Sequence, residues 1–193
     1  MARRFANAYC DNPPGLSEHE LIVVVNGGGK ITPRQERLFD PLVPTFLYHD
    51  NSGKDIGAFR MAARTIPADL MIFLGGPVRP ARAGWLDRIV RVYEDCGPAL
   101  FGNFCFHEPV THVRTTVWWC PPEIVNSHTL PIHNDLRYEF EHGTRSITRH
   151  TQQLGFPVLQ VTWKQVCPVE HWHYLANEEC LFLDQFTDTL GYK

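Results

Sequence analysis

Histidines near carboxylates are the residues of this chain best suited to chemistry. The chain has ten histidines; His107 and His112 flank Glu108, and His171 and His173 flank a tryptophan. Two imidazoles and one carboxylate form a ligand set that zinc and other transition metals accept. On a strand, His171 and His173 would point to the same face. Ordinary hydrogen-bonded histidines are the competing explanation, and no H-E-x-x-H spacing decides between the two.

Two loops rich in glycine, asparagine and aspartate are a second candidate for chemistry. The glycine run 27–29 is followed by Lys30, and its backbone amides can face phosphate groups. The P-loop spacing is missing, which favours a plain flexible loop over a phosphate site. Asp50 and Asn51 lie in the second loop, residues 49–55, where they either contact a ligand or shape a turn.

The elements that must position these residues follow from the hydrophobic pattern of the first half. Short apolar runs predict buried strands at residues 21–25, 45–49, 70–74 and 99–106. Capped or amphipathic segments predict helices at residues 33–40, 56–65 and 82–95. Alternating strands and helices predict a mostly parallel sheet, whose ligands bind at the carboxyl ends of the strands. Both polar loops follow strands and are expected at that edge.

The second half of the chain is less regular. Residues 115–119 and 156–161 are expected to be strands, and residues 121–135 an ordered, proline-rich loop. Residues 138–154 predict one helix that ends before Gly155. The expected fold is therefore α/β: a single-domain, three-layer α/β/α sandwich with a mostly parallel, Rossmann-like sheet.

Composition and charge narrow the classes of function. The 193 residues suit one domain, and 44% hydrophobic with 20% charged residues is ordinary for a globular protein. The formal net charge of −3 argues against a protein that coats nucleic acid. No apolar run is long enough for a transmembrane segment or a secretory signal. A cytoplasmic protein is expected, with its six cysteines reduced because no secretory signal is found. None of them forms a CxxC pair, which argues against a structural zinc site.

Four segments resemble, in order, motifs of family-2-type glycosyltransferases of the GT-A fold. Residues 49–55 resemble the D-[DN]-x-S-x-D stretch that ends their second strand, and residues 68–74 resemble the strand before their DxD metal motif. Residues 85–86 resemble the start of the next helix, and residues 141–158 resemble the E-D…R…G-[YF]-x-[VI] block. The resemblance covers residues 21–163 and implies the GT-A fold.

The resemblance also implies an activity and the residues that carry it. It implies a nucleotide-diphospho-sugar donor held by residues 21–106, and a carbohydrate or other hydroxyl acceptor beside residues 107–193. The expected donor-binding residues are Asn26, Gly27, Asp50, Asn51, Asp55, Arg79 and Arg149. Glu141 and His142 match the family's acidic pair, so either is the expected base that deprotonates the acceptor. Asp55 is equally suited to cap the helix that follows it.

Two departures from the family pattern affect the metal and the base. Gly75-Gly76-Pro77 stands where the family keeps DxD, whose carboxylates hold Mn²⁺ or Mg²⁺ against the diphosphate. His142 stands where the family has its second acid. The expectation is a metal-independent transferase in which arginines stabilise the leaving diphosphate, or one whose metal is held elsewhere. By the resemblance, His171 or His173 is a candidate ligand for such a metal.

Two other classes of function remain open at this stage. One is a non-catalytic, glycosyltransferase-like module that binds a nucleotide or sugar, which the missing DxD favours. The other is a metal-dependent hydrolase with the four histidines at positions 107, 112, 171 and 173. The chain is short for a complete transferase, and a homodimer is one way to complete the acceptor site.

Overall fold

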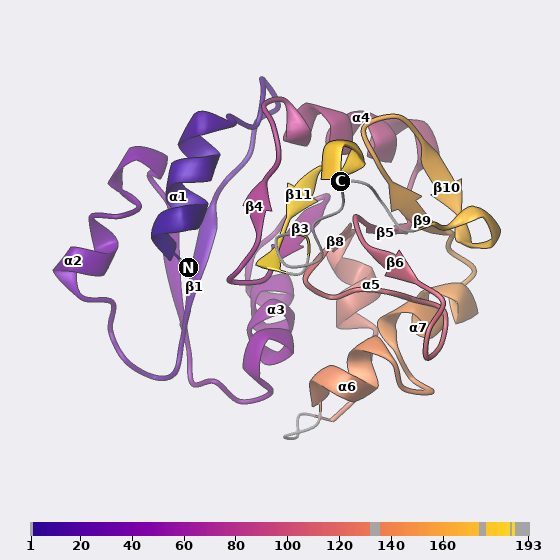
Figure 1. Cartoon of the computed structure of the whole chain (residues 1–193). Helices are drawn as coiled ribbons and strands as arrows, with labels where there is room; N and C mark the ends of the chain where they lie inside the picture. Colours follow the sequence, from indigo (N-terminus) through magenta and orange to yellow (C-terminus); the bar gives the residue numbers. More distant parts are fainter. Residues whose placement is uncertain (1, 132–135, 174–176, 186, 188–193) are drawn as a thin grey trace.

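The structure is a computed structural model that describes residues 2–131, 136–173, 177–185 and 187 (Figure 1). Its α-helices are α1 (Ala2–Asp11), α2 (Pro33–Glu36), α3 (Lys54–Thr65), α4 (Trp85–Cys96), α5 (Pro122–Asn126), α6 (Leu136–Glu141) and α7 (Ile147–Gln153). Its 3-10 turns are η1 (Asp40–Leu42), η2 (Val169–His171) and η3 (Asn177–Glu179). Its strands are β1 (Ile22–Asn26), β2 (Thr45–His49), β3 (Met71–Leu74), β4 (Arg79–Pro80), β5 (Leu100–Gly102), β6 (Cys105–Phe106), β7 (His112–Val113), β8 (Val117–Cys120), β9 (Val158–Val161), β10 (Val166–Pro168) and β11 (Phe182–Leu183). The fold is mixed α/β.

The main sheet has five strands in the order β10-β9-β5-β8-β3. Strand β9 pairs parallel with β5, whereas β8 is antiparallel to both β5 and β3. Strands β3, β5 and β9 therefore share one direction. Strands β1 and β2 form a separate parallel pair, and β4 with β11 and β6 with β7 form small antiparallel pairs.

The predicted mostly parallel sheet is thus wrong for the main sheet, which has mixed directions. The cause is the hairpin of β6 and β7, which follows β5 directly. A hairpin brings the chain back beside the strand that it left, so the next strand, β8, runs antiparallel to β5. The apolar runs at β1, β2, β3 and β9 were predicted correctly as strands, to within two residues at each end.

Strand β8 divides two apolar cores on opposite faces of the main sheet. Side chains alternate along a strand, so Trp118 and Trp119 point to opposite faces. Trp118 packs with Phe73 and Phe140 in the core that includes residues of α3, α6 and α7. Trp119 packs with Phe101 in the core that includes residues of α4 and β11. Both tryptophans are fully buried, so β8 holds the two halves of the domain together.

The helix predicted for residues 138–154 is two helices, α6 and α7, with a turn between them. A Cβ atom at Gly143 would meet the backbone of Glu139 at 2.7 Å, so the chain turns where only glycine fits. Ser146 then caps α7, with its side chain accepting from the backbone N–H of Arg149. Glu141 consequently ends one helix instead of opening another. Arg145 and Arg149 do not share one helix face.

Three smaller features complete the comparison with the sequence. Residues 121–135 were expected to be a loop, but α5 forms within them, and residues 132–135 lie outside the described residues. All six cysteines are free thiols, as predicted, and four of them are buried. None of the described helices is both long enough and apolar enough to cross a lipid bilayer.

Candidate functional site

Polar groups gather where β3 and β5 end and β8 begins. The backbone N–H of Gly75, directly after β3, donates to the carbonyl of Thr116 at 2.8 Å. The backbone N–H of Asn103, directly after β5, donates to the carbonyl of Val117 at 3.4 Å. The loop that replaces DxD therefore lies against the segment before β8. This is the strand edge at which α/β sheets bind their ligands.

Glu141 reaches this edge from the end of α6. Its Oε2 accepts hydrogen bonds from the backbone N–H of Thr115, at 3.1 Å, and from the Thr115 hydroxyl. The residue is only 7% exposed. Two donors on one oxygen offset part of the cost of burying the carboxylate and fix its orientation. Its second oxygen, Oε1, faces away from Thr115.

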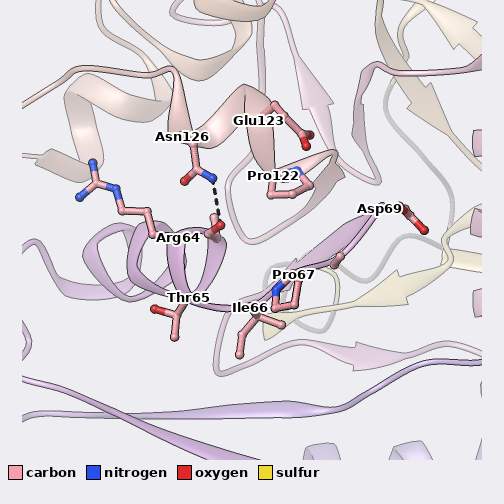
Figure 2. Close-up of a pocket in the computed structure, with 10 residues that line it drawn as sticks. Arg64, Thr65, Ile66, Pro67, Asp69, Pro122, Glu123 and Asn126 are labelled. Carbon is pink, nitrogen blue, oxygen red and sulfur yellow. Dashed lines mark hydrogen bonds between the residues drawn. The ribbon is translucent and has the colours of Figure 1, made fainter.

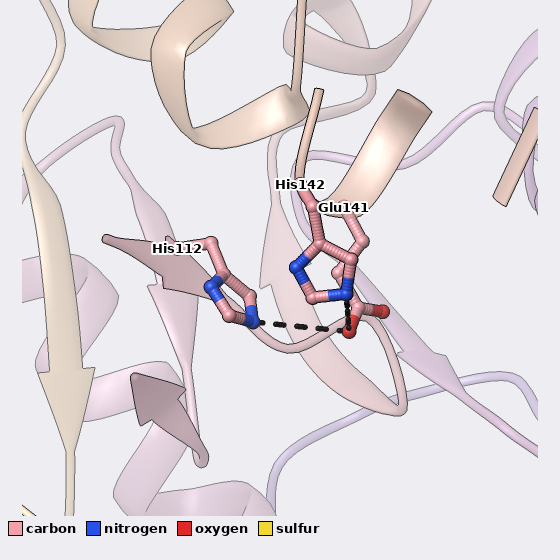
Figure 3. Close-up of side chains that lie close together, drawn as sticks. All are labelled: His112, Glu141 and His142. Atoms are coloured by element: carbon pink, nitrogen blue, oxygen red, sulfur yellow. Dashed lines mark ion pairs between the residues drawn. The ribbon is translucent and has the colours of Figure 1, made fainter. Parts of the chain in front are cut away.

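Two imidazoles meet this second oxygen (Figure 3). The Nε2 atom of His142 lies 3.3 Å from Oε1, and the Nε2 atom of His112 lies 3.8 Å from it. The two rings stand edge to face with their centroids 4.3 Å apart. His112 comes from β7 and is buried, whereas the His142 side chain is 23% exposed. Solvent therefore reaches this cluster from the His142 side.

Hydrogen bonding fixes the tautomer of His112. Its Nδ1 lies 2.6 Å from the carbonyl oxygen of Val110, which can only accept, so Nδ1 carries the proton. Burial lowers the pKa of His112, which favours the neutral ring. The Nε2 lone pair of the neutral ring then points toward Glu141 Oε1. Two acceptors facing each other in a buried place call for a positive group between them.

The predicted donor residues of the second loop form a tight turn. Asp50 Oδ1 accepts from the Ser52 backbone N–H at 2.9 Å and from its hydroxyl at 2.6 Å, and these bonds lower the pKa of Asp50. Asn51 has a positive φ of 76°, which asparagine tolerates better than most residues. Asn26 Oδ1 lies 2.8 Å from His49 Nδ1, so the ends of β1 and β2 are tied together.

Asp55 connects that loop with the helix of Glu141. Its carboxylate lies 3.7 Å from the guanidinium of Arg137, which is in α6, four residues before Glu141. Residues four apart lie on one face of a helix, so the loop after β2 and the cluster flank the same helix. The predicted cap is wrong: Gly53 occupies the N-cap position of α3, and Asp55 lies in the first turn.

The glycine loop after β1 has fewer free amides than expected. The backbone N–H groups of Gly27 and Gly28 both donate to the carbonyl of His49, at 3.0 and 3.1 Å. These two amides close the loop on β2 instead of facing solvent. A phosphate at this loop would have to be held by other groups, such as Lys30 or the Asn26 side chain.

The two predicted arginines lie on different elements. Arg79 is in β4, which pairs with β11. Arg149 is in α7, and this helix touches the strand of His112, because Thr148 Oγ1 accepts from the backbone N–H of Val113 at 2.9 Å. Arg149 is thus one residue from a contact to the strand that carries His112.

His171 and His173 are not on a strand, so the prediction of a shared strand face is wrong. His171 ends η2, and His173 Nε2 lies 3.8 Å from Glu179. His107 Nε2 lies 3.4 Å from the carbonyl of Trp172. Within the described ranges, the group of potential metal ligands found is His112, Glu141 and His142, whose ligand atoms all lie within 4.8 Å of one another.

A hollow lies elsewhere on the described part of the chain (Figure 2). Its volume is about 630 Å³, and it lies at the opposite end of β3, between residues 63–69 and the start of α5. Asn126 Nδ2 donates to the carbonyl of Ala63 across it at 2.9 Å. The hollow is lined by charged side chains, among them Arg64, Asp69 and Glu123, but these do not converge on one point. Convergent polar groups favour the cluster over this hollow as the functional site.

Comparisons with known proteins found no relative of this chain. No family model matches the chain, and neither a curated protein nor a solved structure matches it significantly. Sequence reasoning singled out Glu141 and His142, but it grouped His112 with the wrong histidines. The spacing held no signal for the correct group, because the hairpin and the turn at Gly143 bring it together.

Proposed function

We propose that this chain is a glycosyltransferase of GT-A type, which moves a sugar from a nucleotide-diphosphate donor to an acceptor hydroxyl. One observation carries the proposal. Contacts link three segments that were predicted from motif order: the loop after β2, the loop after β3 and the Glu141–His142 pair. Asp55 of the first loop contacts Arg137 of α6. Gly75 of the second loop is connected through Thr116 to Thr115, which binds Glu141. Such convergence from distant parts of the chain is what a ligand site at a strand edge requires.

The donor is proposed to lie over the ends of β1, β2 and β3. Asn26, Asn51 and Asp55 offer polar side chains to the nucleoside, and the rigid turn at Asp50 orients them. Gly75-Gly76-Pro77 leaves room for the diphosphate but offers no side-chain ligand. Positive charge for the leaving group has to come from Arg79, Arg149 or a cation, because a departing diphosphate gains negative charge.

The acceptor hydroxyl is proposed to lose its proton at the Glu141–His142 pair. Glu141 is buried and bound to Thr115 through one oxygen. His142 is the more exposed member, and Glu141 Oε1 is 3.3 Å from its ring. A carboxylate that holds an imidazole in one orientation makes that imidazole an effective proton acceptor. Glu141 is therefore a positioning residue in this scheme. The proton acceptor is His142 Nδ1, a buried atom without a hydrogen-bond partner among the described residues, which the acceptor hydroxyl has to reach.

Calorimetric titration with UDP, GDP, CDP, ADP and TDP in the presence of EDTA tests the donor site. We expect one diphosphate to bind selectively, and Asp55→Asn to weaken its binding about tenfold. Asp40→Asn is the matched control, because Asp40 is an exposed aspartate of η1. Equal binding by Asp55→Asn and the unmodified chain would remove Asp55 from the site. No binding by any diphosphate would overturn the donor site itself.

The Gly75-Gly76-Pro77 loop favours a second candidate, a nucleotide- or sugar-binding module without transfer activity. The loop has no carboxylate where the family holds its cation. Selective binding of one nucleotide without release of nucleoside diphosphate from the corresponding nucleotide sugar would support the module over the transferase.

A further inference from the structure

We infer that His112, Glu141 and His142 hold a divalent transition-metal ion. The inference concerns the reaction centre of the proposed transferase, and it rests on that function only for the ion's role in the chemistry. Its evidence is the arrangement of three side chains from two segments that are distant in sequence, β7 and the end of α6 with the residue after it (Figure 3). Neither the missing DxD nor the late histidines enter into it.

The distances match those of metal ligands. Metal–nitrogen and metal–oxygen bonds of about 2.0–2.1 Å place two tetrahedral ligand atoms about 3.3 Å apart. His142 Nε2 and Glu141 Oε1 are 3.3 Å apart, and His112 Nε2 and Glu141 Oε1 are 3.8 Å apart. The two histidine nitrogens lie within 4.8 Å of each other, so the rings would have to move closer together, by up to about 1.5 Å, to bind one ion.

Two of the three side chains are held by the outer contacts that metal ligands use. A ligating histidine usually donates its other ring N–H to a carbonyl or carboxylate. His112 does so, from Nδ1 to the Val110 carbonyl at 2.6 Å, which leaves Nε2 to face the ion. A ligating carboxylate is usually hydrogen-bonded in turn, and Glu141 accepts both hydrogen bonds of Thr115 on its outer oxygen.

The charges of the cluster also fit a cation. Glu141 is a buried carboxylate, and its oxygen that is not bound to Thr115 faces the Nε2 atom of His112, whose Nδ1 is held by the Val110 carbonyl. A divalent ion would turn this meeting of acceptors into an attraction.

The ligand types select the class of ion. Imidazole nitrogen suits zinc, copper, iron and nickel, whereas magnesium, calcium and manganese prefer oxygen ligands. Three protein ligands leave at least one position open, as in catalytic zinc sites, and the partly exposed His142 marks the side from which a hydroxyl could enter. A hydroxyl bound there would lose its proton more readily, so the ion would replace the free base of the metal-independent scheme.

The test uses the full chain, stripped with a chelator and titrated calorimetrically with Zn²⁺ alone, and separately with Co²⁺ followed by its visible absorption. We expect one ion per chain, a tetrahedral or five-coordinate Co²⁺ spectrum, and at least a 100-fold loss of affinity in Glu141→Gln and His142→Gln. Circular dichroism identifies any variant that fails to fold. Thr115→Val keeps all three ligands and should weaken binding about 10- to 100-fold.

His107→Gln and His173→Gln are the matched controls, since each removes a histidine outside the cluster and should leave the affinity unchanged. Absence of Zn²⁺ binding by the folded chain would overturn the inference. So would folded Glu141→Gln and His142→Gln variants that bind Zn²⁺ as the unmodified chain does. The proposed function fails separately, in the nucleotide titrations with EDTA, where no metal is present.

Discussion

Two pairs of histidines in this fold have nearly the same ring geometry and different surroundings. His112 and His142 stand edge to face with ring centroids 4.3 Å apart, and His128 and His150 do so at 4.9 Å. The first pair shares the carboxylate of Glu141. In the second pair, His128 Nε2 donates to the Arg145 carbonyl at 2.6 Å, and His150 Nε2 lies 2.9 Å from the Ser127 hydroxyl.

The charges around the two pairs are opposite. The guanidinium of Arg60 donates to the carbonyls of His128 and Leu130, so a buried positive group lies beside the second pair. A cation would be repelled there and attracted beside Glu141. Ring geometry alone therefore does not identify a functional histidine pair. The neighbouring carboxylate distinguishes the candidate site from a pair that serves packing.

Removing the carboxylate should have the largest effect on stability. In Glu141→Ala, the backbone N–H and hydroxyl of Thr115 lose their acceptor while they stay buried. We expect a loss of about 3 kcal/mol in the free energy of unfolding, measured with urea at pH 7. His150→Ala, at a half-buried ring with one side-chain partner, should cost about 1 kcal/mol. Equal losses would remove the distinction between the two pairs.

Lowering the pH should destabilise the fold through protonation of His128, a member of the His128–His150 pair. Burial lowers the pKa of His128 to about 4, while the unfolded value is about 6.5. Between these values the unfolded chain binds more protons, so stability falls as pH decreases from about 6.5 to 4 and is unaffected above. The loss should reach about 3 kcal/mol at the low end. Urea unfolding of His128→Gln at pH 7 and pH 4.5 should show a correspondingly weaker dependence; an unchanged dependence assigns the effect to other groups.

Binding of Zn²⁺ should stabilise the fold through the His112–His142 pair only. An ion bound solely by the native state at 100 times its dissociation constant adds about 2.7 kcal/mol. For a chain of this size, that corresponds to a rise of roughly 5–10 °C in the midpoint of thermal unfolding. We expect the rise in His150→Gln and not in His142→Gln. A rise of equal size in both variants would place the ion outside the cluster.

The smallest effect should come from Ser127→Ala. The Ser127 hydroxyl lies 2.9 Å from His150 Nε2 and also donates to the Ile124 carbonyl at 3.1 Å, in a partly exposed position. Water can replace such bonds, so we expect a loss of at most about 1 kcal/mol and no change in zinc affinity. Calorimetry with Zn²⁺ and urea unfolding of this variant measure both. A change in zinc affinity would couple the two pairs.

The sequence was sufficient where local pattern decides structure. The apolar runs at β1, β2 and β3 predicted strands, and the apolar face of residues 82–95 predicted α4. The predicted burial is wrong for β1 and β2, which are half-buried to exposed because they form a separate pair outside the main sheet. It was insufficient where tertiary contacts decide. Nothing in the residues of β8 indicates its antiparallel direction, which the preceding hairpin sets. Gly143 was not recognised as a helix break, although it accounts for the turn between α6 and α7.

The candidate site, like the fold, could be predicted from the sequence only in part. Motif order singled out Glu141, His142 and the loop after β2. The roles of Thr115, Arg137 and His112 depend on distances between segments, which no spacing in the chain reveals. Asp50 and Asn51 illustrate the opposite case, since their turn chemistry is local and the expected turn is present.

The most direct test of the account is release of nucleoside diphosphate from nucleotide sugars by the purified chain, with and without added Zn²⁺ or Mn²⁺. The account predicts slow release from one nucleotide sugar, acceleration by a hydroxyl acceptor, and loss of release in His142→Gln while binding of the nucleotide persists. Release that is undiminished in His142→Gln, or no release from any nucleotide sugar under either condition, would contradict it.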